Sequence, residues 1–172
     1  MANKQNFAPQ EWLKILESVT LTGMAVSAAD PNGLWGLTKE AFANRSALTA
    51  AKLDAGSNEL VKAVIADYES KGGRTAIVCA LRERVAGAEP ADIVQRALDD
   101  LRDVSAILDA KAPDDAAAFK ALLLSISQKV ATAAMEHTVL GFGGVRVSDA
   151  EKATLADIAE ALNPSHRASV QL

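Results

Sequence analysis

The sequence is poor in the residues from which most metal sites are built. It has one cysteine, Cys79, and two histidines, His137 and His166, among 172 residues. A single cysteine cannot form an internal disulfide, and neither histidine has a second histidine or cysteine at zinc-ligand spacing. Glu136 directly precedes His137, so the Glu-x-x-His pair of di-iron bundles is missing as well. We therefore expect no tight zinc or di-iron site and no cofactor.

Aromatic residues are also scarce, at 4% of the chain, although hydrophobic residues reach 49%. Alanine supplies much of this apolar content, and alanine is the best helix former because it loses no side-chain entropy in a helix. The β-branched and aromatic runs that favour sheets are lacking. The composition therefore predicts an all-α protein. Because Cys79 lies among Ala76, Ile77 and Ala80, we expect it to be a small buried hydrophobe.

The chain has no excess of positive charge and no long apolar run. Its 18 basic and 22 acidic residues are interspersed and give a formal net charge of −4. This balance argues against a nucleic-acid partner, which would require a basic stripe. The most apolar stretch, residues 116–134, is interrupted by Lys120 and Lys129, and residues 1–6 lack the apolar core of a signal peptide. We expect a cytoplasmic protein of bacterial type without a membrane span.

Apolar residues recur at intervals of three and four between turn residues, which predicts a compact bundle of about seven helices. Ser148 and Glu151 form a capping box, the clearest local helix signal in the chain. We expect Ser57 to cap the third helix and Gly72 and Gly73 to break it. The first predicted helix runs from Pro9 to the Asp30 turn, the second from about Leu34 to Leu53, and the third from Ser57 to Gly72. A short fourth helix follows and stops at Gly87. The last three begin at Pro90, Pro113 and Ser148.

We expect a single domain over residues 9–162, with a flexible N-terminal segment at 1–8 and a flexible tail at 163–172. The apolar residues of the sixth helix that should face the core are Phe119, Leu123, Ile126, Val130 and Ala133. The fifth helix should lie at the surface because one of its faces is strongly charged. That predicted surface face consists of Asp92, Arg96, Asp99, Asp100, Arg102 and Asp103.

A glycine-rich loop precedes the last helix, and helix packing alone would not require it. Its glycines, Gly141, Gly143 and Gly144, allow the backbone to approach a ligand closely. With Arg146, Ser148 and the helix N-terminus, they could form an anion-binding nest. The simpler alternative, which we favour, is that Leu140, Phe142 and Val147 pack into the core while the glycines turn the chain. A phosphate-binding P-loop is excluded because no Gly-Lys-Ser/Thr follows.

Two pieces of the sequence resemble the repeated element of the tellurite-resistance TerB-like helical family. The first is Ala28-Ala29-Asp30-Pro31-Asn32-Gly33, followed by Lys39-Glu40. The second is Val147-Ser148-Asp149-Ala150-Glu151, followed by Leu155, Ile158 and Leu162. The resemblance implies an all-helical fold and a role in stress or metal response. It also implies that Asp30, Glu40, Asp149 and Glu151 could supply oxygen ligands to a metal ion.

The sequence shows neither an acid–base pair nor an activated nucleophile, so an enzyme is the function class we expect least. The leading hypothesis is a non-catalytic helical protein that acts through protein–protein contacts, either with another protein or as a homodimer. Two alternatives stay open. One is a TerB-like stress- or metal-response protein, and the other is a small-molecule or anion binder at the loop from Gly141 to Ser148.

Overall fold

The computed structural model describes residues 1–29, 46–52, 58–135 and 148–163. These residues form an all-α bundle with seven α-helical segments and no strand, as the composition and periodicity predicted. Residues 46–52, the part of the predicted second helix that the structure describes, are helical. The other elements are a 3₁₀-helix, η1 (Lys4–Asn6), and the helices α1 (Pro9–Ala29), α3 (Glu59–Glu69), α4 (Lys71–Val85), α5 (Pro90–Lys111), α6 (Pro113–Met135) and α7 (Asp149–Leu162).

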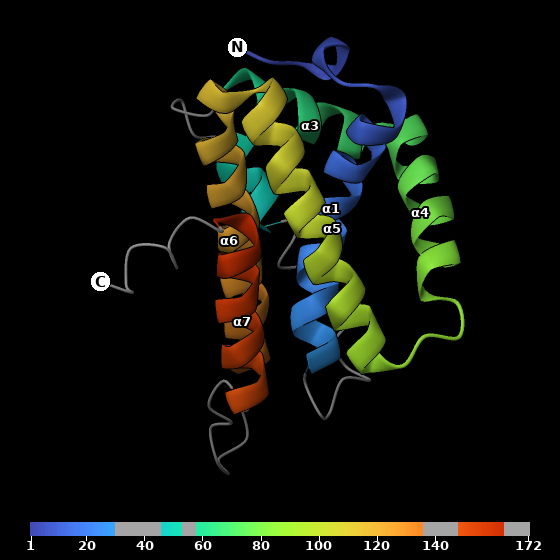
Figure 1. Cartoon of the computed structure of the whole chain (residues 1–172), viewed down its shortest axis with the longest axis vertical. Helices are drawn as coiled ribbons and strands as arrows, with labels where there is room; N and C mark the ends of the chain where they lie inside the picture. The colour runs from blue at the N-terminus through green and yellow to red at the C-terminus, as the bar shows by residue number, and fades with distance from the viewer. Residues whose placement is uncertain (30–45, 53–57, 136–147, 164–172) are drawn as a thin grey trace.

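Helix α1 is the centre of the bundle and contacts α3, α4, α5, α6 and α7 (Figure 1). It buries side chains around most of its circumference, including Ile15 and Val19. The buried hydroxyl groups of α1 therefore form hydrogen bonds within the helix. Ser18 Oγ donates to the carbonyl of Ile15, and Thr22 Oγ1 donates to the carbonyl of Ser18. The core is completed by Leu101, Leu108, Phe119, Leu123, Ile126, Ile158 and Leu162.

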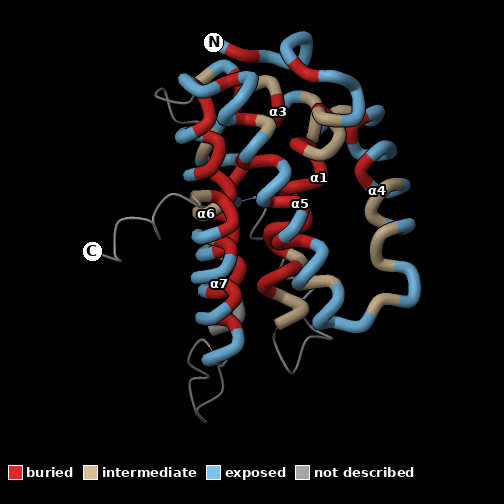
Figure 2. The backbone as a smooth tube through the Cα atoms, viewed as in Figure 1, coloured by how far each residue is buried: buried red, intermediate tan, exposed pale blue. Residues whose placement is uncertain are grey.

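Helix α4 lies at one edge of the molecule, on the opposite side of the bundle from α6 and α7 (Figure 1). Figure 2 shows that most of α4 is exposed, whereas α5 and α7 are buried along one side. Its buried residues are Gly73 and Ile77. Cys79 is exposed, contrary to our expectation, because it lies two residues beyond Ile77 and therefore on the opposite side of the helix.

The helix ends follow the capping rules with two differences from prediction. Ser148 and Glu151 form the expected capping box. Asn58 is the N-cap of α3, one residue after the predicted Ser57. Helix α3 ends at Glu69 because Ser70 is extended and its hydroxyl caps α4 by accepting from Gly73 N. The prediction that Gly72 and Gly73 break the helix was wrong, since both lie in the first turn of α4.

Part of the N-terminal segment, residues 1–8, contacts the bundle. Ala2 is buried and its backbone N–H donates to Asp115 Oδ2 at 2.5 Å. Phe7 is buried as well, with its ring centroid 5.8 Å from that of Trp12. An apolar ring and a paired backbone amide therefore hold this segment in place. Residues 164–172 of the predicted tail lie outside the described residues.

Within the described residues, no helix is both long enough and apolar enough to cross a membrane.

Candidate functional site

The residues of the predicted anion site lie mostly outside the described part of the chain. Gly141, Gly143, Gly144 and Arg146 belong to the stretch 136–147 that the structure does not describe. Ser148 is described, and its hydroxyl accepts a hydrogen bond from Glu151 N at 3.1 Å. This bond caps α7, so the described geometry gives Ser148 a structural role. The anion-binding hypothesis stays a prediction.

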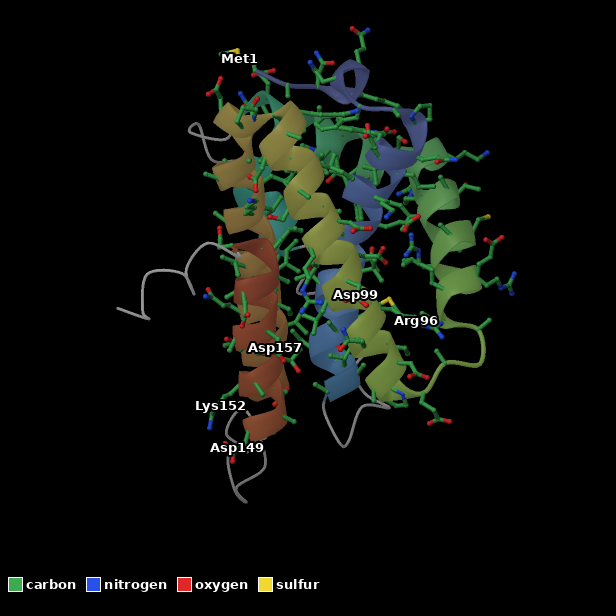
Figure 3. The ribbon with its side chains drawn as sticks, viewed as in Figure 1. Met1, Arg96, Asp99, Asp149, Lys152 and Asp157 are labelled. Atoms are coloured by element: carbon green, nitrogen blue, oxygen red, sulfur yellow. The ribbon has the colours of Figure 1, made fainter. Side chains whose placement is uncertain are left out.

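The predicted metal ligands do not come together in the described residues. Asp30 and Glu40 lie outside them. Asp149 is fully exposed at the start of α7, 3.0 Å from Lys152 Nζ, and Figure 3 places both side chains at that end of the helix. Glu151 is buried, and its Oε2 accepts from Ser148 N at 2.8 Å. The described residues contain no group of three or more His, Cys, Asp or Glu side chains that could hold a metal ion. The metal site stays a prediction.

The described structure brings together a set of charges that the sequence analysis missed. Arg84, near the end of α4, lies between Glu17 of α1 and Asp100 of α5. Its Nε is 3.0 Å from Glu17 Oε2, and its Nη1 donates to Asp100 Oδ2. The side chains of Glu17 and Asp100 are 2% and 12% exposed, and that of Arg84 is 32% exposed. We call Glu17, Arg84 and Asp100 the charge cluster.

Helical periodicity places each member of the charge cluster. Arg84 is seven residues after Ile77, two turns along α4, so both side chains face the bundle. Asp100 is three residues after the buried Ala97 and four before the buried Val104. It therefore lies at the edge of the apolar stripe of α5. The prediction that Asp100 belongs to the exposed face was wrong, whereas the other five residues of that face are not buried.

A further contact joins the end of α4 to α5. Arg96 Nη1 donates to the backbone carbonyl of Arg84 at 2.5 Å. Figure 3 shows Arg96 and Asp99 on α5 near this end of α4. A guanidinium group at a helix C-terminus also interacts favourably with the negative end of the helix dipole. The last turn of α4 is thus held by side-chain and backbone contacts together.

The electrostatics of the charge cluster are dominated by burial. Burial raises the pKa of Glu17, and the negative charge of Asp100 adds to the increase, while Arg84 and Lys14 oppose it. Among the described residues, Glu17 Oε2 has no hydrogen-bond partner with proper geometry. The 3.0 Å contact with Arg84 Nε is therefore an ion pair whose N–H is not aimed at the oxygen.

The charge cluster is better suited to joining helices than to catalysis. A perturbed pKa is found both in catalytic groups and in structural ion-pair networks. A general acid or base must reach the proton that it transfers, and the Glu17 side chain is only 2% exposed. Two carboxylates share one guanidinium group here, and the three groups come from three different helices. The arrangement therefore links α4 to the centre of the bundle.

A second polar cluster holds the start of α4. Asp67, near the end of α3, accepts hydrogen bonds from Lys4 Nζ at 2.8 Å, Trp12 Nε1 at 2.7 Å and Ser70 Oγ at 3.2 Å. The bonds from Lys4 and Trp12 lower the pKa of Asp67. Since Ser70 caps α4, this cluster links η1, α1, α3 and the first turn of α4.

The surface of α4 that points away from the bundle combines apolar and basic side chains. Val78 is 65% exposed, and it is one of two large hydrophobic residues among the described ones that are exposed, with Met1 the other. Cys79 is exposed on the same side. Basic residues lie about one to two turns on either side of Val78. We call this surface the outer face of α4, and it consists of Lys71, Arg74, Thr75, Val78, Cys79 and Arg82.

No family model matches this sequence, and no match is found among curated proteins or among solved structures. The resemblance to the TerB-like family therefore still depends on the two sequence pieces that suggested it.

Proposed function

We propose that this chain is a non-catalytic helical protein that acts through protein–protein contacts, with a second copy of the chain as its partner. The outer face of α4 is the proposed contact surface. The observation that carries the proposal is the 65% exposure of Val78 on a helix that buries only Gly73 and Ile77. Burial of a valine side chain stabilises a contact by roughly 1.5 kcal/mol or more.

The charge of the outer face supports a partner of opposite sign. Helix α4 carries four basic residues and one acidic residue, whereas the whole chain has a formal net charge of −4. The rest of the chain is therefore strongly acidic. A second copy offers acidic surface to the basic residues around Val78, and complementary charges raise the rate and the specificity of association.

The charge cluster supports the non-catalytic part of the proposal. Burial raises the pKa of Glu17, and its side chain is paired with Arg84 of α4. The cluster holds together the helix that presents the outer face. Holding α4 in place is a sufficient role for the charge cluster, and this role requires no substrate.

Sedimentation velocity of the full chain tests this proposal. We expect reversible self-association as the concentration rises through the micromolar range, weakened by salt because charges contribute. Val78→Glu should abolish the association without lowering the melting temperature, since Val78 is exposed. Ala121→Glu is the matched control, because Ala121 is an exposed residue on α6.

Two results would contradict the proposal. One is a wild-type chain that remains monomeric at every concentration. The other is an association that persists unchanged in the Val78→Glu variant, which would place the contact on a different surface. Loss of association in both variants would also count against the outer face of α4, because the effect would not be specific to it.

A further inference from the structure

Helix α4 buries few apolar side chains and has polar attachments at both ends. Across its 15 residues it buries Gly73 and Ile77. Helix α3 is shorter, at 11 residues, and buries Leu60, Val61, Val64 and Ile65. Ile77 is thus the one large apolar side chain that α4 buries fully, and Leu81 is partly buried against the core. The attachment at the two ends of α4 is polar, through Ser70 and Asp67 at the start and through Arg84 at the end.

The segments that flank α4 allow it to move. Ser70 is extended and separates α3 from α4. After Val85 the chain turns through Gly87, which has a φ of +67° and no atom within 4 Å of the position where a β-carbon would lie. A glycine in this conformation is free of steric contacts, so the turn can absorb a change in backbone angles.

We propose that α4 opens away from α1 and α5 as a unit, with Ser70 and Gly87 as pivots and with the pairing of Arg84 to Glu17 and Asp100 as the latch. Opening separates Arg84 from both carboxylates and removes Ile77 from the core. The proposal concerns the motion of α4 and does not depend on self-association.

Opening of α4 breaks few apolar contacts. Local opening requires little free energy where few apolar contacts are lost, and α4 loses those of Ile77 and the partly buried Leu81. The hydrogen bond from Arg96 to the carbonyl of Arg84 is lost too. The ion pairs of the charge cluster are lost as well, but opening returns their charges to water. Glu17 gains the most hydration free energy on opening, because its Oε2 is buried without an aligned hydrogen bond. Hydration of the separated charges therefore offsets much of the lost pairing.

Native-state hydrogen exchange, followed by mass spectrometry on the full chain, tests the opening. We expect peptides from residues 71–85 to exchange at least roughly tenfold faster than peptides from the buried parts of α1 and α5, under conditions where the bundle stays folded. Equal protection of α4 and α5 would overturn the proposal, because α4 would then exchange only when the whole domain unfolds.

Two variants test the latch. Asp100→Asn weakens the pairing of Arg84, and we expect roughly tenfold faster exchange in residues 71–85 with little change in α6 and α7. Arg102→Gln is the control, because Arg102 is an exposed residue of the same helix that pairs with Asp99. It should leave the exchange of α4 unchanged. Faster exchange spread equally over all helices in Asp100→Asn, or no change in α4, would overturn the latch.

Discussion

Gly73 faces the backbone carbonyl of Asp67 so closely that a β-carbon at position 73 would overlap the carbonyl oxygen. The neighbouring Gly72 has open space, and its nearest atom would be Ser70 Oγ at 4.0 Å. The turn from α3 into α4 can therefore close only with a glycine at position 73. Two adjacent glycines thus have different roles in the same helical turn.

This difference predicts opposite effects of two alanine substitutions. Gly73→Ala should lower the free energy of unfolding by about 1–3 kcal/mol, because α4 must shift away from α3 to relieve the overlap. Gly72→Ala should leave stability unchanged or raise it by up to about 1 kcal/mol, since alanine favours the helix. Urea denaturation of both variants measures this. Equal shifts in the two midpoints would show that the overlap does not determine the turn.

The raised pKa of Glu17 predicts the sign of a pH effect. The folded-state pKa lies above the unfolded value, which is near 4.5, so the folded chain binds the proton more tightly. Its contribution to stability is therefore present below pH 4.5 and is lost as the pH rises through the folded-state pKa. Glu17→Gln cannot ionise, so its stability relative to wild type should increase as the pH rises from 4.5.

Glu11 provides a control of opposite sign. Its pKa is lowered, first by the hydrogen bond from Lys111 and then by that from Ala8 N. Its contribution is present above the unfolded pKa and is lost as the pH falls, so Glu11→Gln should become less stable relative to wild type as the pH rises. Denaturation curves over a series of pH values measure both. A pH-independent difference for Glu17→Gln would show that burial does not perturb this carboxyl group.

The parts of the fold that depend on local sequence could be predicted, and those that depend on packing could not. The stripe of α6 was correct because Phe119, Leu123, Ile126 and Val130 recur every three or four residues, and all four are buried. The capping box at Ser148 was correct because its two hydrogen bonds join residues only three apart.

The errors arose where contacts between distant helices decide the outcome. Ser70 ends α3 with the help of Asp67 and Trp12. Glycines are usually the stronger stop signal, so the sequence predicts the break at Gly72 and Gly73 instead. Glu17, Arg84 and Asp100 pair across three helices. Residue spacing predicts which side of a helix is buried, but it does not predict how three helices lie relative to one another. The spacing of Asp100 from Ala97 and Val104 was the one sequence signal that Asp100 faces the core. A charged residue is usually assigned to the surface, so this spacing did not lead to the correct prediction.

The pair of Lys120 and Asp109 predicts unequal effects of removing either partner. Lys120 is buried on α6, and its Nζ donates to both carboxylate oxygens of Asp109 on α5, at 2.7 and 2.8 Å. Asp109→Ala leaves the ammonium group of a largely buried side chain unpaired and should lower the free energy of unfolding by about 1–3 kcal/mol. Lys120→Met keeps most of the apolar stem and removes the buried charge, so it should change stability by less than about 1 kcal/mol. Thermal unfolding compares the two, and a larger loss in Lys120→Met would contradict this account.

The capping box of α7 predicts a local loss of stability that does not depend on charge. Ser148→Ala removes the acceptor for Glu151 N and should lower the free energy of unfolding by about 1 kcal/mol. Asp149→Asn is the control, because Asp149 is adjacent but fully exposed. It should change stability by less than about 0.5 kcal/mol.

The loss in Ser148→Ala should be confined to the start of α7. Ser105 Oγ donates to the carbonyl of Leu162 at 2.9 Å, so the far end of α7 stays attached to α5. Hydrogen exchange in Ser148→Ala should therefore accelerate only in the first turns of the helix. Uniform acceleration along α7 would show that the cap determines the docking of the whole helix, not only its start.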